Sequence, residues 1–406
     1  MIVDYLRFSR HHWRHLLFGI VLMGLSSLGQ TYYISLFGEH LRADYQLSSG
    51  GLGSAYAFAT LASAMTLTWV GRWIDRTSVE RFTLGVALVL SCACVLMALS
   101  RNVAFLVVSF YFLRLGGQGL MVHTAQTTIA RLFPVNRGKA LSLSALGIPL
   151  GEALLPILVV TGMLAIGWRN TWYIGSVVVI LGALFALHFL PAKAADVGGV
   201  GATPQSADAS IGKLNLWADR RLWFTLPALL ATPFVVTGFF FHQARLVDEK
   251  GWSLTWVATC FVGYAAARAV ALLAIGPVID RLGAVRILPY FLLPLGMAAG
   301  VLAFSSSAYA VPLYLVCMGM SAGTASVMAT SIWVELYGVQ QLARVRSSVA
   351  AADVVASGIS PVAMGWLIDV GVPLSRQALI CIAGLIVVSL LARRVGRFDN
   401  SQAVHA

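Results

Sequence analysis

The sequence Gly-Arg-Trp-Ile-Asp-Arg, at positions 71–76, is a short charged stretch between two long apolar runs. A second copy of the pattern, Gly-Pro-Val-Ile-Asp-Arg, stands at positions 276–281, which is 205 residues later in a chain of 406. Two other pairs follow the same offset, Lys139 with Arg344 and Pro156 with Pro361. A repeat that spans half of the chain predicts one ancestral unit that was duplicated.

The composition is that of a membrane protein. Hydrophobic residues make up 59% of the chain and charged residues 11%, with a mean hydropathy of +0.82, whereas soluble domains are about 25% charged. Each apolar run must be helical, because lipid offers no hydrogen bonds to a bare backbone. The sequence predicts an all-α polytopic protein with twelve transmembrane helices, at 16–38, 52–70, 83–100, 103–130, 140–163, 171–190, 222–244, 254–276, 287–304, 309–333, 347–368 and 377–392.

The positive charges are distributed unevenly between the two sides of the predicted helices. The net charge is +12, and 20 of the 28 Lys and Arg residues fall in segments on the side of the N-terminus. Six fall on the opposite side, and two, Arg114 and Arg268, lie within apolar runs. This bias predicts that both termini are cytoplasmic. It also accounts for the basic net charge, so no nucleic-acid partner is expected.

A polar segment at 191–221, rich in Gly, Ala and Ser, interrupts the pattern of apolar runs. Such composition is typical of a flexible linker. We therefore expect six-helix halves at 1–190 and 222–406, joined by a cytoplasmic linker. The five cysteines all fall in apolar runs, where they are expected to pack as small hydrophobic residues, and no metal site or cofactor is expected.

Two six-helix halves with an acidic-basic motif after the second helix of each half resemble the major facilitator superfamily. The fourth predicted helix matches a second motif of that family, Arg-x-x-x-Gln-Gly, through Arg114, Gly117, Gln118 and Gly119. The resemblance implies a monomeric secondary transporter of the bacterial inner membrane that works by alternating access, and not an enzyme. It also implies gating roles for the repeated stretch, namely for Gly71, Asp75, Arg76, Gly276, Asp280 and Arg281.

Within that superfamily, the second half is similar to bacterial monocarboxylate and oxalate/formate transporters. One arginine, Arg268, lies deep in the predicted eighth helix, and the eleventh carries Gly-Trp-Leu-Ile-Asp at 365–369. Monocarboxylate transporters usually have an aspartate one turn before this arginine, where Tyr264 stands here.

Ionisable side chains in the membrane are candidate functional residues, because they are costly unless paired or hydrated. A guanidinium at Arg268 is expected to hold a carboxylate through two parallel hydrogen bonds; the alternative is permanent neutralisation by a neighbouring acid. Further expected substrate contacts are Tyr264, Gln30, Tyr33 and His242, although Gln30 and Tyr33 are equally expected to pack, and a lone histidine is more often a packing residue.

Proton coupling is expected from Glu152, Arg114 and Asp353. Burial raises the pKa of a carboxyl toward neutrality, which suits Glu152 as a proton carrier; alternatively it pairs with Arg114. Asp353, near the cytoplasmic end of the eleventh predicted helix, suits a gate or a structural pair better. Asp75 is expected to cap the following helix or to pair with a basic residue across the halves.

These features predict proton-coupled transport of a small organic anion, most similar to a monocarboxylate. The alternative is a proton-driven efflux antiporter for drugs or metabolites, which Glu152 favours and which the degraded Gly-Pro-x-x-Gly-Gly motif around Pro149 and Gly151 disfavours. The chain has no Gly-x-x-x-x-Gly-Lys-[Ser/Thr] motif, so direct use of ATP is not expected. Clustered His, Asp and Glu residues typical of a membrane enzyme are also missing from the sequence.

Overall fold

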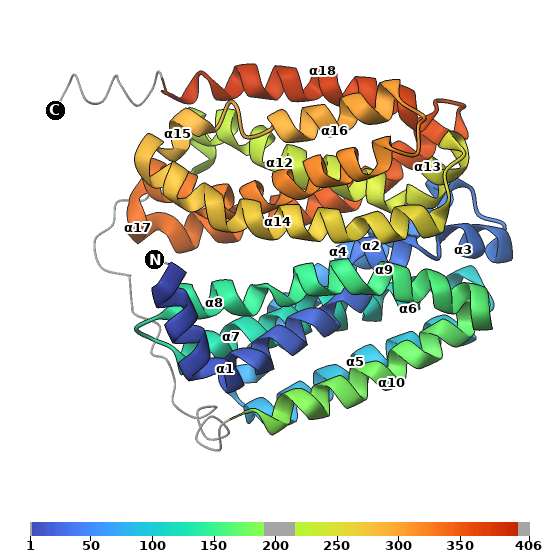
Figure 1. The fold of residues 1–406 in the computed structure, drawn as a ribbon, viewed down its shortest axis with the longest axis horizontal. Coiled ribbons are helices and arrows are strands. Elements are labelled where there is room, and N and C mark those ends of the chain that lie inside the picture. The colour runs from blue at the N-terminus through green and yellow to red at the C-terminus, as the bar shows by residue number, and fades with distance from the viewer. Residues whose placement is uncertain (1, 191–215, 397–406) are drawn as a thin grey trace. The chain divides into compact units, whose positions relative to one another are not determined.

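The computed structural model describes residues 2–190 and 216–396, except for the side chains of residues 2–6, 217, 339, 340, 343, 344, 347 and 348. The first 25 residues of the expected linker and the Arg344 side chain therefore lie outside the described part. Every regular element among the described residues is a helix, which confirms the all-α class (Figure 1). Two compact units emerge, one from residues 1–46 and 55–206, and the other from 47–54 and 207–406.

The helices of the first unit form from the apolar runs of the sequence, and short connections join them. Its α10 runs beside α5, and α1 contacts α7, α8, α9 and α10. Its elements are α1 (Ile2–Leu25), η1 (Ser26–Gly29), α2 (Thr31–Ser35), α3 (Gly38–Tyr45), most of α4 (Ser49–Val70), η2 (Gly71–Asp75), α5 (Val79–Leu99), α6 (Val103–Leu113), η3 (Arg114–Met121), α7 (Val122–Leu132), α8 (Arg137–Ala145), α9 (Gly147–Ile166) and α10 (Trp168–His188).

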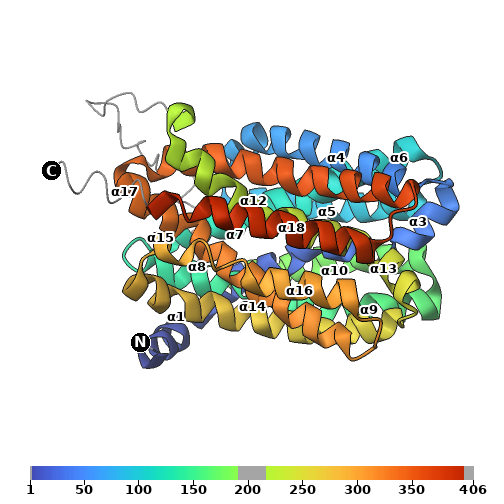
Figure 2. The same cartoon turned by 90° about the horizontal axis from the view of Figure 1, so that it is seen from above.

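The second unit is built in the same way, with α18 beside α12 and α16 in both views (Figures 1 and 2). The first turn of α4, within Leu47–Ser54, clusters with this unit. The other elements are η5 (Leu216–Ala218), α12 (Arg220–Phe241), α13 (Gln243–Lys250), α14 (Leu254–Leu282), α15 (Ala284–Ile287), α16 (Leu293–Phe304), α17 (Ala310–Asp369) and α18 (Leu374–Ala392).

Nine helices in the described part of the chain are long and apolar enough to cross a bilayer. This makes the chain a multi-pass membrane protein, while the count of twelve stays a prediction. The 60-residue α17 supplies two of the nine spans, Ala310–Gly338 and Val349–Asp369. The first of these spans ends at Gly338, whose φ of 74° breaks the helix there. The apolar helix α16 has only 12 residues.

The first predicted helix, 16–38, is not continuous. It passes through the 3₁₀ turn η1 and the extended residue Gln30 (φ −82°, ψ 152°) before α2 begins. The break lies where η1 packs tightly on η3: a Cβ at Gly29 would stand 2.2 Å from the carbonyl oxygen of Leu113, and one at Gly117 would stand 2.6 Å from the Cα of Gly29. Glycine at both positions lets the two backbones touch.

The 205-residue offset reappears in the structure. In the first unit Tyr45 donates to the carbonyl of Ser100 over 2.9 Å; in the second, Lys250 donates to the carbonyl of Ser305 over 3.0 Å. The next residues along, Gln46 and Gly251, both have left-handed backbones, with φ of 52° and 66°. The same local connection is therefore built twice, as the sequence repeat predicts.

The two copies of the charged stretch differ in structure. Gly71–Asp75 forms the 3₁₀ helix η2, whereas residues 276–281 lie inside α14, which continues to Leu282. The expected end of the eighth predicted helix at residue 276 was therefore too early. The helix ends two residues after Arg281 at Gly283, whose φ of 83° suits glycine and stops the helix there.

Candidate functional site

The most unusual polar residue of the first unit is Arg114, the first residue of the π-helical stretch η3. Its side chain is buried, with a relative exposure of 4%. Its Nη1 donates to the carbonyl oxygen of Gly29 over 3.1 Å. Its Cζ lies 5.2 Å from the ring centroid of Tyr56 on α4, a cation–π contact.

The surroundings hold this guanidinium in place. The hydroxyl of Tyr56 shares a 2.8 Å hydrogen bond with Thr31 Oγ1, and its ring packs edge-on against Phe110 at 5.6 Å. Phe110 lies one helical turn before Arg114, whose guanidinium donates to the carbonyl of Gly29 at the break in the first helix. Both the broken first helix and the π-helical turn thus contribute to the position of Arg114.

No carboxylate neutralises Arg114 among the described residues. Its contacts there are a carbonyl and an aromatic ring, and its buried Nε has no hydrogen-bond partner. The alternative that Glu152 pairs with Arg114 is therefore not realised. A buried cation with a free donor, flanked by a ring, is a suitable place for a bound anion.

Glu152 lies on α9 in the same unit and is also buried, with 3% exposure. The neighbouring Gly151 packs against η1 so closely that a Cβ there would stand 2.2 Å from Ser27 Oγ and 3.3 Å from the hydroxyl of Tyr32. The backbone next to Glu152 is therefore fixed beside the broken first helix. Its role in proton coupling stays a prediction.

Gln30 and Tyr33 occupy different environments. Gln30 is half-buried at the extended point between η1 and α2. Tyr33 is buried, with its ring 5.2 Å from that of Trp172 and 5.7 Å from that of Phe37. Packing within the aromatic core accounts for the position of Tyr33.

In the second unit, Arg268 is half-buried on α14. Tight packing of α14 on α17 fixes its backbone, since a Cβ at Gly323 would stand 2.4 Å from the Arg268 carbonyl oxygen. Tyr264, one turn earlier, is 2% exposed and packs edge-on against Phe240 at 5.1 Å. Its neighbours are those of a core aromatic residue.

The other two candidates of this unit lie in different environments. His242 caps α12 and is buried, and its Nε2 lies 2.8 Å from the carbonyl oxygen of Pro361. This contact ties α12 to α17 and gives His242 a structural role. Asp353 is exposed on α17, and the structure records no ion pair for it with any described residue.

The first charged stretch is held by α7 within its own unit. Asp75 forms an ion pair with Arg131, which also approaches the carbonyl of Ile74 at 3.5 Å. The carbonyl of Gly71 lies 3.1 Å from Nε2 of His123, while Arg76 is exposed. The expectation that Asp75 caps the next helix was wrong, because Ser78 caps α5 through a 3.4 Å contact with the amide of Arg81.

At the second copy, Asp280 and Arg281 are exposed near the end of α14, and Gly276 has no atom within 4 Å of its Cβ position. The connection there is held instead by Glu335 of α17, which accepts hydrogen bonds from the amides of Ala284 and Val285. Sequence reasoning missed Arg131 and Glu335. Both are charged residues near the end of an apolar run, and that position was the available signal.

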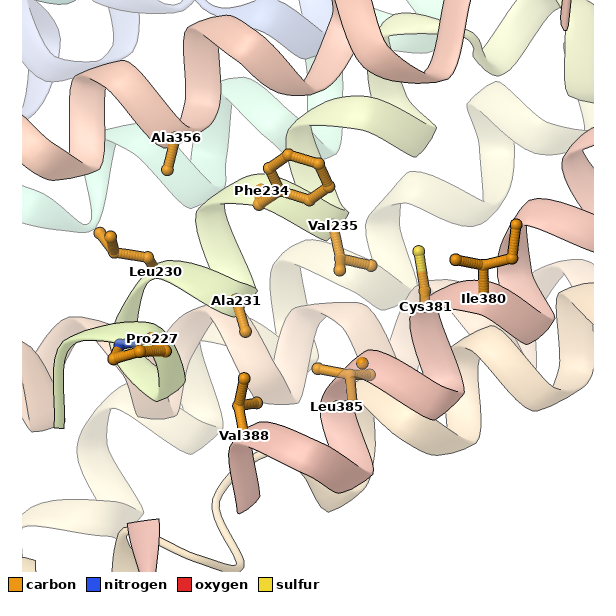
Figure 3. A pocket seen from close by; sticks show the side chains of 11 residues that line it. Pro227, Leu230, Ala231, Phe234, Val235, Ala356, Ile380, Cys381, Leu385 and Val388 are labelled. Atoms are coloured by element: carbon orange, nitrogen blue, oxygen red, sulfur yellow. The ribbon is translucent and has the colours of Figure 1, made fainter. Parts of the chain in front are cut away.

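A cavity of about 440 Å³ in the second unit does not suit a carboxylate (Figure 3). It lies between α12, α17 and α18, and apolar side chains such as Phe234, Leu385 and Val388 point into it together with Cys381. None of its lining residues is charged. Of the described sites, the surroundings of Arg114 fit an anion best.

Comparisons with known proteins agree with this architecture. A model of the Major Facilitator Superfamily matches residues 19–262. A gentisate transporter of Corynebacterium glutamicum is 26% identical over 196 residues, which cover 47% of this chain and 44% of the relative. The matched region is thus less than half of that relative.

Solved structures show the same fold at low sequence identity. A bacterial homologue of the human lysosomal transporter Spinster has a TM-score of 0.71 and 15% identity, over 94% of this chain and 96% of that one. The nucleoside transporter NupG has a TM-score of 0.72 and 12% identity, over 94% and 99%. A POT family transporter in complex with 5-aminolevulinic acid has a TM-score of 0.71 and 13% identity, over 93% and 94%. Since the family match covers more than half of the sequence and the fold agrees, the chain belongs to the Major Facilitator Superfamily of membrane transporters.

Proposed function

We propose that the chain is a secondary transporter for a small organic anion with a carboxylate group, moved together with protons by alternating access. The observation that carries this proposal is Arg114, a buried guanidinium with no carboxylate partner among the described residues. A charge of this kind is costly in a membrane unless it is neutralised. A substrate carboxylate supplies that neutralisation and brings specificity through paired hydrogen bonds.

The surroundings of Arg114 favour an aromatic carboxylate. The ring of Tyr56 lies beside the guanidinium, and Phe110 packs on that ring. An aromatic substrate gains stacking and edge contacts from such neighbours. The 26% identical relative is a gentisate transporter, and gentisate is an aromatic carboxylate. Its name therefore supports this substrate class without identifying the substrate.

Two further residues complete the proposal. Arg268 on α14 is a separate candidate for binding a substrate carboxylate, as its depth in the predicted eighth helix suggests. Glu152, buried beside η1, is the proton carrier. A carboxyl group can bind and release a proton, which is what a proton carrier requires. We propose that both termini are cytoplasmic, following the distribution of Lys and Arg. We also propose a monomer in a bacterial inner membrane, as the resemblance to the superfamily implies.

The test is thermal unfolding of the purified protein with a panel of ligands. The panel contains gentisate, benzoate and lactate as carboxylates and lipophilic cations as the alternative class. The variants are Arg114→Gln and Arg268→Gln, with Arg101→Gln, an exposed arginine between α5 and α6, as the control. A ligand that binds the folded state and not the unfolded state raises Tm, and the rise grows with the logarithm of ligand concentration above Kd.

We expect an aromatic carboxylate to raise the Tm of the wild type and of Arg101→Gln, and to lose this effect in Arg114→Gln. Stabilisation by lipophilic cations alone would favour proton-driven efflux of drugs or metabolites. An equal response of Arg114→Gln and the wild type to the carboxylate would rule out Arg114 as the anion site.

A further inference from the structure

The apolar cavity of the second unit lies entirely within membrane-spanning segments. It is enclosed by α12, α17 and α18, with Pro227 near one end and Ile380 near the other (Figure 3). The three helices contribute from the candidate spans Arg220–Phe241, Val349–Asp369 and Leu374–Ala392. The volume of about 440 Å³ is within the range of ligand pockets, about 300–1,000 Å³. Because the lining side chains are hydrocarbon apart from one thiol, an occupant of this cavity has to be apolar.

The cavity is extended along the helices and opens toward the bilayer. Its lining residues on α18 run from Ile380 to Val388, a rise of about 12 Å along the helix. The hydrocarbon of one leaflet is about 15 Å thick, half of the roughly 30 Å of the whole core. Ile380 is exposed, as are Val387 and Leu390 on the same helix, so the cavity opens on an apolar surface of α18. A lipid chain that enters there can lie along most of the depth of one leaflet.

Three arginines stand at one end of the same helices. Arg393 and Arg394 directly follow α18 and are exposed, and Arg220 is exposed at the start of α12. The Cζ of Arg394 lies 5.9 Å from the ring centroid of Phe224, which shows that the end of α18 lies beside the start of α12. None of the three arginines forms an ion pair with another described residue. This end of the unit therefore carries a cluster of uncompensated positive charge.

The charge cluster and the cavity are placed as the two parts of a lipid require. The nearest acid in sequence, Asp219, is bound by Arg221 in a 3.0 Å ion pair and does not neutralise the cluster. Six residues separate Val388 from Arg394, which corresponds to about 9 Å of helix rise. That distance is close to the thickness of one headgroup region, about 5–8 Å. The cluster thus lies at headgroup level when the cavity lies in the hydrocarbon.

We propose that the α12–α17–α18 cavity binds one acyl chain of an anionic phospholipid, whose phosphate contacts Arg220, Arg393 and Arg394. The apolar lining recognises the chain, and the arginines recognise the negative headgroup, as basic residues at the ends of membrane helices do. A lipid with no net charge fills the cavity but leaves the arginines without a counter-charge. The bound lipid fills the space between α12 and α18 and so stabilises the second unit, with no substrate required.

Two kinds of variant separate the chain from the headgroup. Gly384→Leu fills the cavity, because Gly384 lines it and no atom lies within 4 Å of its Cβ position. Its matched control is Gly300→Leu on α16, an equally open glycine that does not line the cavity. A double variant, Arg393→Gln with Arg394→Gln, removes two of the three cations. Its control is Arg376→Gln, an exposed arginine at the opposite end of α18.

Thermal unfolding in a neutral detergent measures the affinity for lipid, and native mass spectrometry counts the lipids that stay bound. The probes are phosphatidylglycerol, phosphatidylcholine with the same acyl chains, and inorganic phosphate. Each variant is compared with its own lipid-free Tm, which separates lost binding from altered stability. We expect phosphatidylglycerol to raise the Tm of the wild type and of both controls, and the other two probes to have little effect.

The apparent Kd for phosphatidylglycerol should rise at least about tenfold in the double arginine variant, since each basic residue near the surface contributes about a factor of five. A similar rise is expected in Gly384→Leu, because each methylene that leucine displaces contributes about a factor of four. An unchanged Kd in Gly384→Leu would overturn the cavity as the site. An equal response to phosphatidylcholine, or an unchanged Kd in the double variant, would overturn the role of the arginines. Stabilisation by inorganic phosphate equal to that by phosphatidylglycerol would show a surface anion site in place of a lipid site.

Discussion

Asp44 and Glu249, which are 205 residues apart, hold the start of the last helix of their own units. Asp44 forms a 3.0 Å ion pair with Arg169 at the beginning of α10. Glu249 accepts from the amides of Leu374 and Ser375 at the beginning of α18, over 2.7 and 2.9 Å. The repeated position therefore carries an acidic residue in both units. Its partner is an arginine side chain in the first unit and two backbone amides in the second.

This difference predicts unequal effects on stability. Glu249→Ala leaves two helix amides without their acceptor, and we expect a loss of about 1–2 kcal/mol in the free energy of unfolding, as for other helix caps. Asp44→Ala removes an ion pair in which both side chains are more than a third exposed, so we expect a loss below about 1 kcal/mol. Unfolding of both variants in detergent, followed by circular dichroism, measures the two effects. A larger loss for Asp44→Ala would contradict this assignment.

The contact between η1 and η3 predicts that Gly29 cannot carry a side chain. A Cβ at Gly29 would stand 2.2 Å from the Leu113 carbonyl oxygen, so Gly29→Ala forces η1 away from η3. We expect a loss of about 1–3 kcal/mol in stability, typical of overpacking, together with loss of anion binding by Arg114. Gly85→Ala is the control, because no atom lies within 4 Å of the Cβ position at Gly85. Equal stability of the two variants would argue against the close contact.

Asp219 predicts a pH dependence of stability. Burial acts to raise the pKa of its carboxyl, but the hydrogen bonds from Arg221 outweigh burial and set the pKa below its usual value. Because the folded pKa lies below the unfolded one, the pair stabilises the protein at neutral pH. That contribution is lost as the pH falls through about 4 and below.

Comparison of the wild type with Asp219→Asn over this pH range measures the effect. The two side chains are only 16% and 18% exposed, so we expect the variant to be less stable by about 1 kcal/mol at pH 7. The difference should shrink as the pH is lowered toward 3. A difference that stays constant with pH would show that the charge of Asp219 contributes nothing.

Much of the fold could be predicted from local patterns in the sequence. Apolar runs indicated the helices, and the 205-residue repeat indicated a duplicated unit, which the contacts of Tyr45 and Lys250 at the same offset agree with. The end of α14 could not be placed from the repeat, because Gly276 is tolerated inside a helix and the left-handed Gly283 is the residue that stops it. The break at Gln30 was missed because it depends on Gly117, which lies far away in the sequence and against which η1 packs.

The candidate site was predictable in kind but not in its partners. The motif identified Arg114 as a membrane cation, yet nothing local indicates that its acceptor is the carbonyl of Gly29, 85 residues earlier. Tyr33 and Tyr264 were reasonable polar candidates, but each packs among aromatic rings that come from other helices. Residue type identifies candidates for a site, while long-range packing decides which of them can meet a ligand.

On the proposed function, Arg114 binds a substrate carboxylate during transport. The most direct measurement is uptake of radiolabelled gentisate or benzoate into proteoliposomes under an imposed pH gradient, with the wild type, Arg114→Gln and the exposed control Arg101→Gln. We expect gradient-dependent transport by the wild type and the control, and a loss equivalent to about 2–5 kcal/mol of binding energy in Arg114→Gln. Transport by Arg114→Gln at the wild-type rate would show that Arg114 does not bind the substrate carboxylate.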